Sequence, residues 1–359
     1  MAESFRRYRV VRKTKESEVI TSFQLVATDG APLAPGLPGQ YLTLSIPGPE
    51  GEALRTYSLS CDLGQREHYR LSIKREAAPP DSPDAPDGLG SSYMHDRIEE
   101  GDEISALSPR GVFVLDQESS RPVVLLSGGV GLTPMVSMLH SLAGSGRPVW
   151  FIHACETGAV HALREEVLGL GRAANVTVHF VYRAPSEADR AQGRFHSEGL
   201  VNREILQSLL PLDDYEVYLC GPTPFMRAMY QLLQSLGLKK ERIAYEFFGP
   251  ASSLEAEAPA ETPVPVPETT QAPEGSFPIT FAKSGVTAYW DGTVTSLLEL
   301  AEASGLQPEF SCRSGICNSC LSTKVDGEVE YFEEPLDEPE PGEVLLCCSR
   351  PKGPVTIDI

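Results

Sequence analysis

Basic residues are scarce in this chain of 359 residues, since 30 Lys and Arg stand against 50 Asp and Glu and give a net charge of −20. A nucleic-acid-binding protein needs a basic face, and so does a protein that docks on an anionic membrane. The composition therefore argues against both kinds of partner. It leaves room for a protein partner with a basic surface.

A long apolar run is also absent. The most apolar stretch, 123–142, is interrupted by Ser127, three glycines, Pro134 and His140, whereas a membrane-spanning helix needs about 20 mostly apolar residues. The first residues, MAESFRRYRV, contain no apolar segment of a secretory signal. We therefore expect a cytoplasmic protein with reduced thiols, in which cysteines are metal ligands or core residues before they are disulfides.

One segment lacks the means to form a core. Residues 251–275 contain five Pro and five Glu but no Lys, Arg or aromatic residue, a composition typical of an extended linker. The sequence therefore predicts a body, residues 1–250, joined by this linker to a tail, residues 276–359. The linker has a net charge of −5 and the tail one of −9, so most of the negative charge lies in the last part of the chain.

The pattern of apolar residues divides the body near residue 115. Before it come short alternating runs such as VITSFQLVA and GQYLTLSIP, which predict an antiparallel β-barrel over 1–115. After it, continuous runs such as PVVLLSGG and PVWFIHA alternate with helix-like segments, which predicts an α/β domain with a parallel sheet over 116–250. The tail shows a hairpin, a helix, a Cys-rich loop and closing strands, so a multidomain fold is expected.

Five of the eight cysteines lie in the last fifty residues. A C-x4-C-x2-C motif, followed after 26 intervening residues by one more Cys, has the plant-type [2Fe–2S] spacing, whereas structural zinc usually shows two short Cys pairs. The loop CRSGICNSC resembles plant-type ferredoxins, which implies an α+β domain of the β-grasp type. Cys348 could replace Cys347, but in similar proteins the fourth ligand is followed by three residues and often Pro. We therefore predict as ligands Cys312, Cys317, Cys320 and Cys347.

Two segments of the predicted barrel have the features of a flavin site. On one strand, Tyr57 could lie against a planar ring, Ser58 could donate to its reactive nitrogen, and Arg55 could bind a phosphate, with Thr56 between them. An ordinary strand with an exposed Arg is the alternative. Later, a short helix follows small residues that could present free N–H groups to an anion or simply form an N-cap; these are Gly90, Ser91 and Ser92.

Two turns at predicted strand ends have the features of a dinucleotide site, because ligands bind at the carboxyl ends of parallel strands. The first turn is rich in glycine but lacks the G-x-G-x-x-G fingerprint, so tight packing alone would also explain it. The second holds a cysteine that could equally be a buried core thiol. The candidate residues are Gly128, Gly129, Gly131, Thr133 and Pro134 in the first turn, and Cys220, Gly221, Pro222, Phe225 and Met226 in the second.

The motifs RTYSLS, HYRLSIKRE and GLGSSYMHD occur in this order, and with them the chain resembles the ferredoxin–NADP reductase superfamily, most of all the FAD module of flavohaemoglobins and oxygenase reductases. The resemblance implies FAD, with FMN less expected. It also implies that Cys220 approaches the nicotinamide and that Phe248, in the terminal E-F-F-G, covers the flavin. Together with Ser58, these two residues form the predicted catalytic set.

NADH is the expected dinucleotide and NADPH the less expected one. NADP would call for an Arg near its 2′-phosphate. The segment after the strand PVWFIHA offers Glu156 and no cation, while Arg183 follows a different strand.

The expected function is an enzyme that passes electrons from NADH to flavin, then to the [2Fe–2S] cluster, and finally to a separate protein. No globin domain and no Rieske-type C-x-H pair is visible, so the resemblance implies a terminal oxygenase, Rieske-type or cytochrome P450, as the partner of a monomeric reductase. A reductase of a small-molecule acceptor such as quinone is an alternative, and a non-enzymatic redox sensor is a weaker one.

Overall fold

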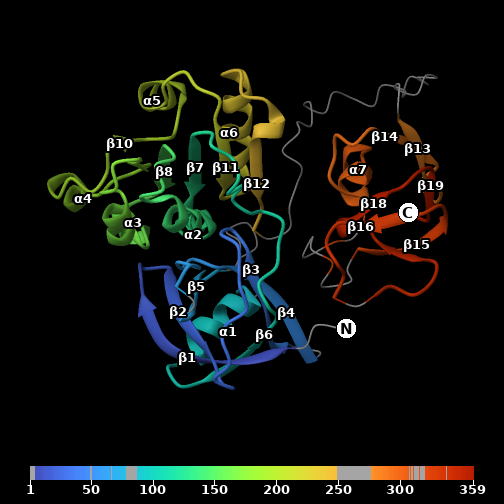
Figure 1. Cartoon of the computed structure of the whole chain (residues 1–359), viewed down its shortest axis with the longest axis horizontal. Helices are drawn as coiled ribbons and strands as arrows, with labels where there is room; N and C mark the ends of the chain where they lie inside the picture. The colour runs from blue at the N-terminus through green and yellow to red at the C-terminus, as the bar shows by residue number, and fades with distance from the viewer. Residues whose placement is uncertain are drawn as a thin grey trace. The chain divides into compact units, whose positions relative to one another are not determined.

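The computed structural model describes residues 5–48, 51–65, 67–77, 87–248, 276–306, 308, 310, 315, 320–336 and 338–359. They form two compact units, one with the described residues up to Phe248 and one with those from 276 onward (Figure 1). The predicted linker lies outside the described residues, as do Cys312 and Cys317. The predicted domain borders stay predictions.

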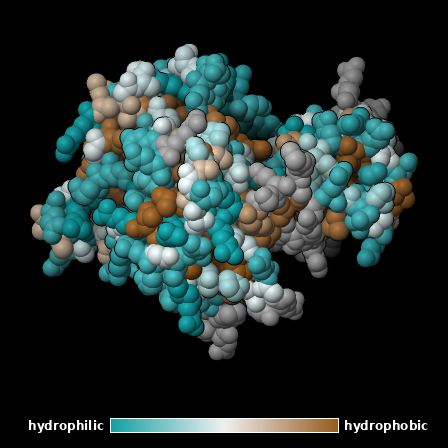
Figure 2. Space-filling view, turned by 60° about the horizontal axis from the view of Figure 1, so that its bottom comes forward, coloured by the Kyte–Doolittle hydropathy of each residue, from teal (hydrophilic) through white to brown (hydrophobic). Residues whose placement is uncertain are grey.

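Within the described ranges, no helix is long and apolar enough to cross a membrane. The face shown in Figure 2 is mostly hydrophilic, with apolar side chains in small patches between polar ones.

The first sheet has six antiparallel strands in the order β4-β3-β6-β1-β2-β5. Alternate side chains point inward, so residues such as Phe23, Leu42 and Leu71 are fully buried. The chain that leaves β4 bridges back to β5 through Leu59 and Leu71, which brings the two outer strands together. The predicted antiparallel flavin fold is confirmed. Its elements are β1 (Arg6–Lys15), β2 (Ile20–Ala27), β3 (Tyr41–Gly48), β4 (Gly51–Ser58), β5 (Tyr69–Lys74), α1 (Leu89–Arg97) and β6 (Glu103–Ala106).

The second sheet is parallel throughout, in the order β10-β9-β8-β7-β11-β12. Its central strands are apolar along their length because helices cover both faces of such sheets, and all six residues of β7 are buried. This confirms the predicted α/β domain. Its elements are β7 (Val123–Gly128), η1 (Gly129–Gly131), α2 (Leu132–Leu142), β8 (Val149–Cys155), η2 (Gly158–Val160), α3 (Arg164–Leu170), β9 (Val176–Tyr182), α4 (Glu187–Ala191), β10 (Ser197–Glu198), α5 (Arg203–Leu209), β11 (Glu216–Cys220), α6 (Thr223–Ser235), η3 (Lys240–Arg242) and β12 (Ile243–Glu246).

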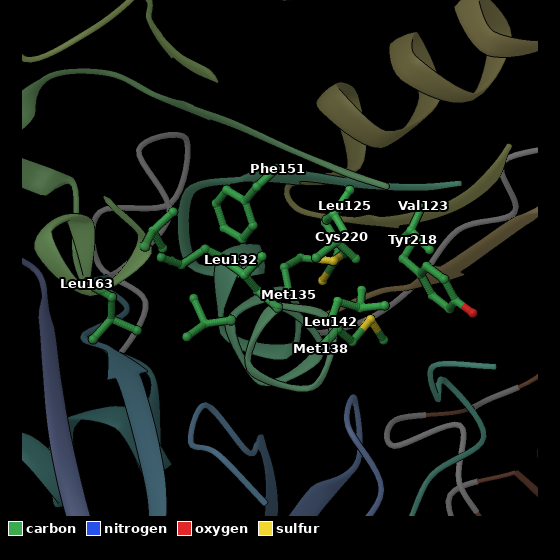
Figure 3. Close-up of a cluster of buried hydrophobic side chains, with 14 of the residues drawn as sticks. Val123, Leu125, Leu132, Met135, Met138, Leu142, Phe151, Leu163, Tyr218 and Cys220 are labelled. Carbon is green, nitrogen blue, oxygen red and sulfur yellow. The ribbon is translucent and has the colours of Figure 1, made fainter. Parts of the chain in front are cut away.

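One apolar cluster joins the parallel sheet to α2 and to the first sheet. Figure 3 shows Met135, Met138 and Leu142 on α2 packed against the sheet near Leu125 and Cys220. The same cluster takes in Ile20 of β2, with Val19 packed against it. The flavin sheet and the parallel sheet therefore share a hydrophobic core, which stabilises their relative position.

The C-terminal unit has the mixed pattern that the sequence predicts. A hairpin, β13 and β14, pairs with β19 in a five-stranded sheet of order β14-β13-β19-β15-β17, and β16 and β18 form a separate pair. Its core includes Phe281, Leu297 and the three thiols of Cys320, Cys347 and Cys348. The elements are β13 (Phe277–Phe281), β14 (Val286–Trp290), α7 (Leu297–Ala303), β15 (Leu321–Asp326), β16 (Val329–Tyr331), β17 (Glu343–Leu345), η4 (Leu346–Cys348), β18 (Ser349–Pro351) and β19 (Val355–Ile357).

Candidate functional site

The structure brings the two predicted flavin segments together. An added Cβ at Gly90 would lie 2.6 Å from the Tyr57 hydroxyl oxygen and 2.7 Å from Cγ of Arg55. Only glycine therefore allows the start of α1 to approach β4 this closely. Arg55 and Thr56 are exposed while Tyr57 is half-buried, and burial raises the pKa of the Tyr57 phenol, which stays neutral.

The beginning of α1 offers donors to an anion. Among the described residues, no side chain caps this helix at Gly88, so its first N–H groups remain available. The Ser91 hydroxyl donates to the Gly88 carbonyl at 3.0 Å and accepts from the Glu76 N–H at 3.1 Å, so it links α1 to the residues that follow β5. The Ser92 hydroxyl, in contrast, is buried without a described partner, which suits a phosphate oxygen of FAD.

The two predicted nucleotide-binding turns touch each other. An added Cβ at Gly131 would lie 2.3 Å from the Cys220 carbonyl oxygen, and one at Gly128 would lie 3.0 Å from the Phe225 ring. The glycines of the first turn therefore let it pack against the second. Gly129 has a positive φ of 53° and faces open space, which leaves its backbone accessible to a pyrophosphate.

The remaining predicted residues of these turns divide into accessible and buried ones. Pro222 is exposed and Phe225 is half-buried. Thr133 is buried, and its hydroxyl donates to the Val130 carbonyl at 3.1 Å. Pro134 and Met226 are also buried, so their side chains pack in the core.

A glutamate that the sequence analysis did not single out joins the predicted catalytic residues. Cys220 and Glu246 are register partners on β11 and β12, and the Ser58 hydroxyl donates to Oε2 of Glu246 at 3.4 Å. Burial, helped by the nearby Glu246 carboxylate, raises the pKa of Cys220, which stays a neutral thiol. Glu246 could have been recognised in the sequence by its position at a strand end, two residues before Phe248.

Phe248 is the last described residue of the first unit, and 41% of its surface is exposed. The preceding Phe247 packs edge-on against Tyr245 with ring centroids 5.7 Å apart. An exposed aromatic ring beside Glu246 suits a cover for a planar cofactor.

Two further loops lie at the carboxyl ends of β8 and β9. Arg183 pairs with Glu156 at 3.1 Å, so the cation noted in the sequence contacts the carboxylate that follows the neighbouring strand. Asp189 holds the same loops, since it accepts the N–H groups of Gly158 at 3.1 Å and Ser186 at 2.9 Å.

The described part of the cysteine site has thiol acceptors and backbone donors. The Gly315 N–H donates to Sγ of Cys347 at 3.3 Å, and the Cys347 N–H donates to Sγ of Cys320 at 3.4 Å. Such bonds stabilise thiolate ligands of an iron–sulfur cluster. The Cys348 thiol donates instead to the Leu345 carbonyl at 3.8 Å. The arrangement favours Cys347 as the fourth ligand, and the ligand set stays a prediction.

Comparisons with known proteins agree with this arrangement. Three family models match in succession: an oxidoreductase FAD-binding domain over residues 7–115, an oxidoreductase NAD-binding domain over 125–231 and a 2Fe-2S iron-sulfur cluster binding domain over 279–352. A flavohemoprotein of Bacillus thuringiensis subsp. konkukian is 46% identical over 259 residues, which are 70% of this chain. The chain spans 63% of the length of that relative.

Two solved structures extend the likeness. The flavohem-like FAD/NAD binding domain of nitric oxide dioxygenase from Vibrio cholerae O1 biovar El Tor is 35% identical, with 68% of this chain and 99% of that chain covered and a TM-score of 0.59. Phthalate dioxygenase reductase is 25% identical, with 99% of this chain and 98% of that chain covered and a TM-score of 0.57.

The chain belongs to the ferredoxin–NADP reductase superfamily, with a flavohaemoglobin-type FAD- and NAD-binding module followed by a C-terminal [2Fe–2S] ferredoxin domain. It is accordingly a flavin and iron–sulfur oxidoreductase. The resemblance stated from the motifs and the expected cofactor domains are confirmed.

Proposed function

We propose that this chain is the reductase component of an oxygenase system, which passes electrons from NADH through FAD and a [2Fe–2S] cluster to a separate terminal oxygenase. One observation carries the proposal: a nicotinamide–flavin edge and a ferredoxin-type cysteine site are present in one chain. Phthalate dioxygenase reductase, which matches nearly the whole length, is described as a modular structure for electron transfer from pyridine nucleotides to [2Fe–2S].

Each part of the first unit has a task in this proposal. Bound FAD supplies the ability to take two electrons from NADH at once and to release them singly to the cluster. Arg55, Ser92 and the N–H groups of α1 would hold its phosphates, and Tyr57 and Phe248 would flank its ring. Ser58, fixed by Glu246, would orient a hydroxyl toward the ring's reactive nitrogen.

Cys220 has a different task. Because burial keeps its thiol neutral, it would place no charge beside the nicotinamide ring. The turns around Gly131 and Cys220 would hold the dinucleotide over the carboxyl ends of β7 and β11, where parallel sheets bind their ligands. Close packing of these turns would exclude water from the hydride-transfer site.

The dinucleotide that fits best is NADH. Glu156 could accept a hydrogen bond from the 2′-hydroxyl of the adenosine ribose, whereas it would repel a 2′-phosphate. Arg183, the cation that follows β9, is already paired with Glu156. We expect Glu156→Gln to narrow the preference for NADH over NADPH by about tenfold, since one charged contact is removed. Comparison of kcat/KM for the two dinucleotides tests this preference.

The proposed acceptor is a terminal oxygenase, Rieske-type or cytochrome P450. The tail has a net charge of −9, which suits a partner with a basic docking face. The direct test is an anaerobic titration with NADH followed by absorbance, in which flavin and cluster bands should both bleach. Failure of either band to bleach would contradict the electron path.

A second measurement tests the acceptor. NADH turnover should be faster with a purified Rieske-type oxygenase or cytochrome P450 than with a quinone at equal concentration. Faster turnover with the quinone would contradict an oxygenase partner and favour a small-molecule reductase.

A further inference from the structure

An ion pair connects the flavin sheet to the nicotinamide domain. Arg70, on β5, donates from Nη1 to Oε2 of Glu166 at 2.7 Å and from Nη2 to Oε1 at 2.8 Å, and Glu166 lies on α3. The Arg70 side chain is 13% exposed and that of Glu166 is 26% exposed. A bidentate pair with this little exposure fixes the orientation of α3 relative to β5 as well as the distance between them.

On the flavin side, the same guanidinium holds the strand that carries the flavin motif. Its Nε donates to the Ser60 hydroxyl at 3.2 Å, and its Nη2 donates to the Ser60 carbonyl. Ser60 follows Ser58 by two residues. Leu59, between them, is bridged to Leu71, the neighbour of Arg70 on β5. Arg70 therefore divides its donors between the flavin strand and α3.

On the nicotinamide side, the link continues to α2. Nε2 of His140 donates to Oε1 of Glu166 at 2.7 Å, and His140 lies in the last turn of the helix that starts at the glycine turn. Burial alone would raise the pKa of Glu166, but the hydrogen bonds from His140 and Arg70 outweigh it and lower the pKa to about 2. The carboxylate therefore stays ionised and accepts from both sides.

Other described contacts between these two domains do not reach α2 from the residues that follow Ser58 or are not directional. They include the apolar cluster around Ile20, a backbone hydrogen bond from the Glu18 N–H to the Ala159 carbonyl at 3.0 Å, and the hydrogen bond from Ser58 to Glu246 on β12. Apolar contact tolerates small shifts, whereas hydride transfer loses about a hundredfold in rate when the reacting atoms are misplaced by about 1 Å. The Ser60–Arg70–Glu166–His140 network directly connects the residues that follow Ser58 of β4 to α2, the helix after the glycine turn.

We propose that Arg70, through Glu166 and His140, is a positioning residue for hydride transfer: it fixes the strand of Ser58 relative to α2, and so the flavin ring relative to the nicotinamide. The inference rests on the proposed function, because it assumes that NADH reduces the bound flavin. It assigns to Arg70 no contact with either cofactor.

The test compares the full-length protein with its Arg70→Met, Arg70→Lys, Glu166→Gln and Arg70→Met/Glu166→Gln variants, each with flavin and iron content measured. Anaerobic stopped-flow absorbance gives the rate of flavin reduction and the dissociation constant for NADH. Arg70→Met and Glu166→Gln should each slow reduction by about tenfold or more, with NADH affinity within twofold of wild type. The long-wavelength absorbance of stacked nicotinamide and flavin should decrease in parallel.

Two further results separate positioning from general damage. The double variant should be little slower than either single variant, because both changes remove one link, and Arg70→Lys should recover part of the rate. Arg121→Met is the matched control: its exposed pair with Asp214, at 2.7 Å, lies wholly within the nicotinamide domain, and its reduction rate should equal that of wild type.

Different results would contradict the proposed function and the positioning role of Arg70. If NADH fails to reduce the wild-type flavin, the proposed function fails. If wild type is reduced but Arg70→Met and Glu166→Gln are reduced within twofold of its rate, only the positioning role of Arg70 fails. Should Arg70→Met lose its flavin, the Glu166→Gln variant, changed in the other domain, decides the question.

Discussion

Cys220, at the end of β11, and Cys347, in η4, are both buried cysteines, yet the groups around the two sulfurs differ. Around Cys220, an apolar core and the nearby Glu246 raise the pKa of the thiol. Around Cys347, the Gly315 N–H donates to the sulfur, and the Cys347 N–H donates to the sulfur of Cys320. The Cys220 sulfur also accepts a backbone N–H, that of Gly221, so one backbone donor does not distinguish the two thiols. The difference is a second thiol beside Cys347, that of Cys320, where Cys220 has the Glu246 carboxylate instead.

The strongest way to test this comparison is to remove one of two adjacent cysteines. We expect Cys347→Ser to abolish the visible [2Fe–2S] absorbance while flavin content stays unchanged, because a required thiolate is lost. Cys348→Ser should retain the cluster, since the Cys348 thiol donates to the Leu345 carbonyl. Loss of the cluster in Cys348→Ser with retention in Cys347→Ser would reverse the assignment.

The second test changes the environment of Cys220. Glu246→Gln removes the carboxylate that accepts from Ser58, and should slow flavin reduction by NADH by about ten- to a hundredfold, as expected for a misoriented donor. Cluster absorbance should not change. Chemical reduction with dithionite serves as the control, and a normal rate with NADH would show that Glu246 has no part in orienting Ser58.

The third test uses a glycine from each region. Gly131→Ala would place a methyl group 2.3 Å from the Cys220 carbonyl oxygen, and Gly315→Ala would place one 2.8 Å from Sγ of Cys348 at a φ of 67°. The first should weaken NADH binding by about tenfold without loss of iron, and the second should lower iron content without loss of NADH binding. Gly144→Ala, which has a φ of 79° and nothing within 4 Å, controls for backbone strain alone.

The smallest expected effect is a pH dependence of the stability of the first unit alone. Burial lowers the pKa of His153 to about 3 and that of His161 to about 2. Between these values and about 6.5 the unfolded chain binds protons that the folded chain does not, so stability decreases as the pH falls below about 6.5. Thermal unfolding followed by flavin fluorescence should shift down by about 5 °C from pH 7 to pH 5.5. The temperature at which cluster absorbance is lost provides the comparison. If that temperature shifts between pH 7 and pH 5.5 by as much as the flavin transition or more, the buried histidines are not the cause.

Much of this arrangement could be predicted because the signals are local. Alternation in VITSFQLVA and the continuous apolar run of PVVLLSGG indicated the two sheets, and the cysteine spacing indicated the cluster. The positions of the two turns at strand ends indicated one shared edge, and the contact between Gly131 and Cys220 bears out their proximity.

The rest depends on contacts that sequence spacing does not reveal. Ser58 meets Glu246 across 188 positions, and Arg70 meets Glu166 across 96. Ser91 and Ser92 are equivalent as capping or phosphate-binding candidates in the sequence, and only the fold shows that Ser91 is already bonded to Gly88 and Glu76. Met226 is one of the predicted binding residues of the second turn, but it lies on α6 and its side chain is buried.

The place where the first unit ends has a practical consequence. Phe248 is its last described residue and stands beside Glu246 at the proposed flavin site, so a shortened reductase would have to keep Phe248 to stay complete. The described residues from 276 onward belong to the other unit. A gene fusion made directly after Phe248 could therefore exchange one electron carrier for another and leave the oxidation of NADH unchanged.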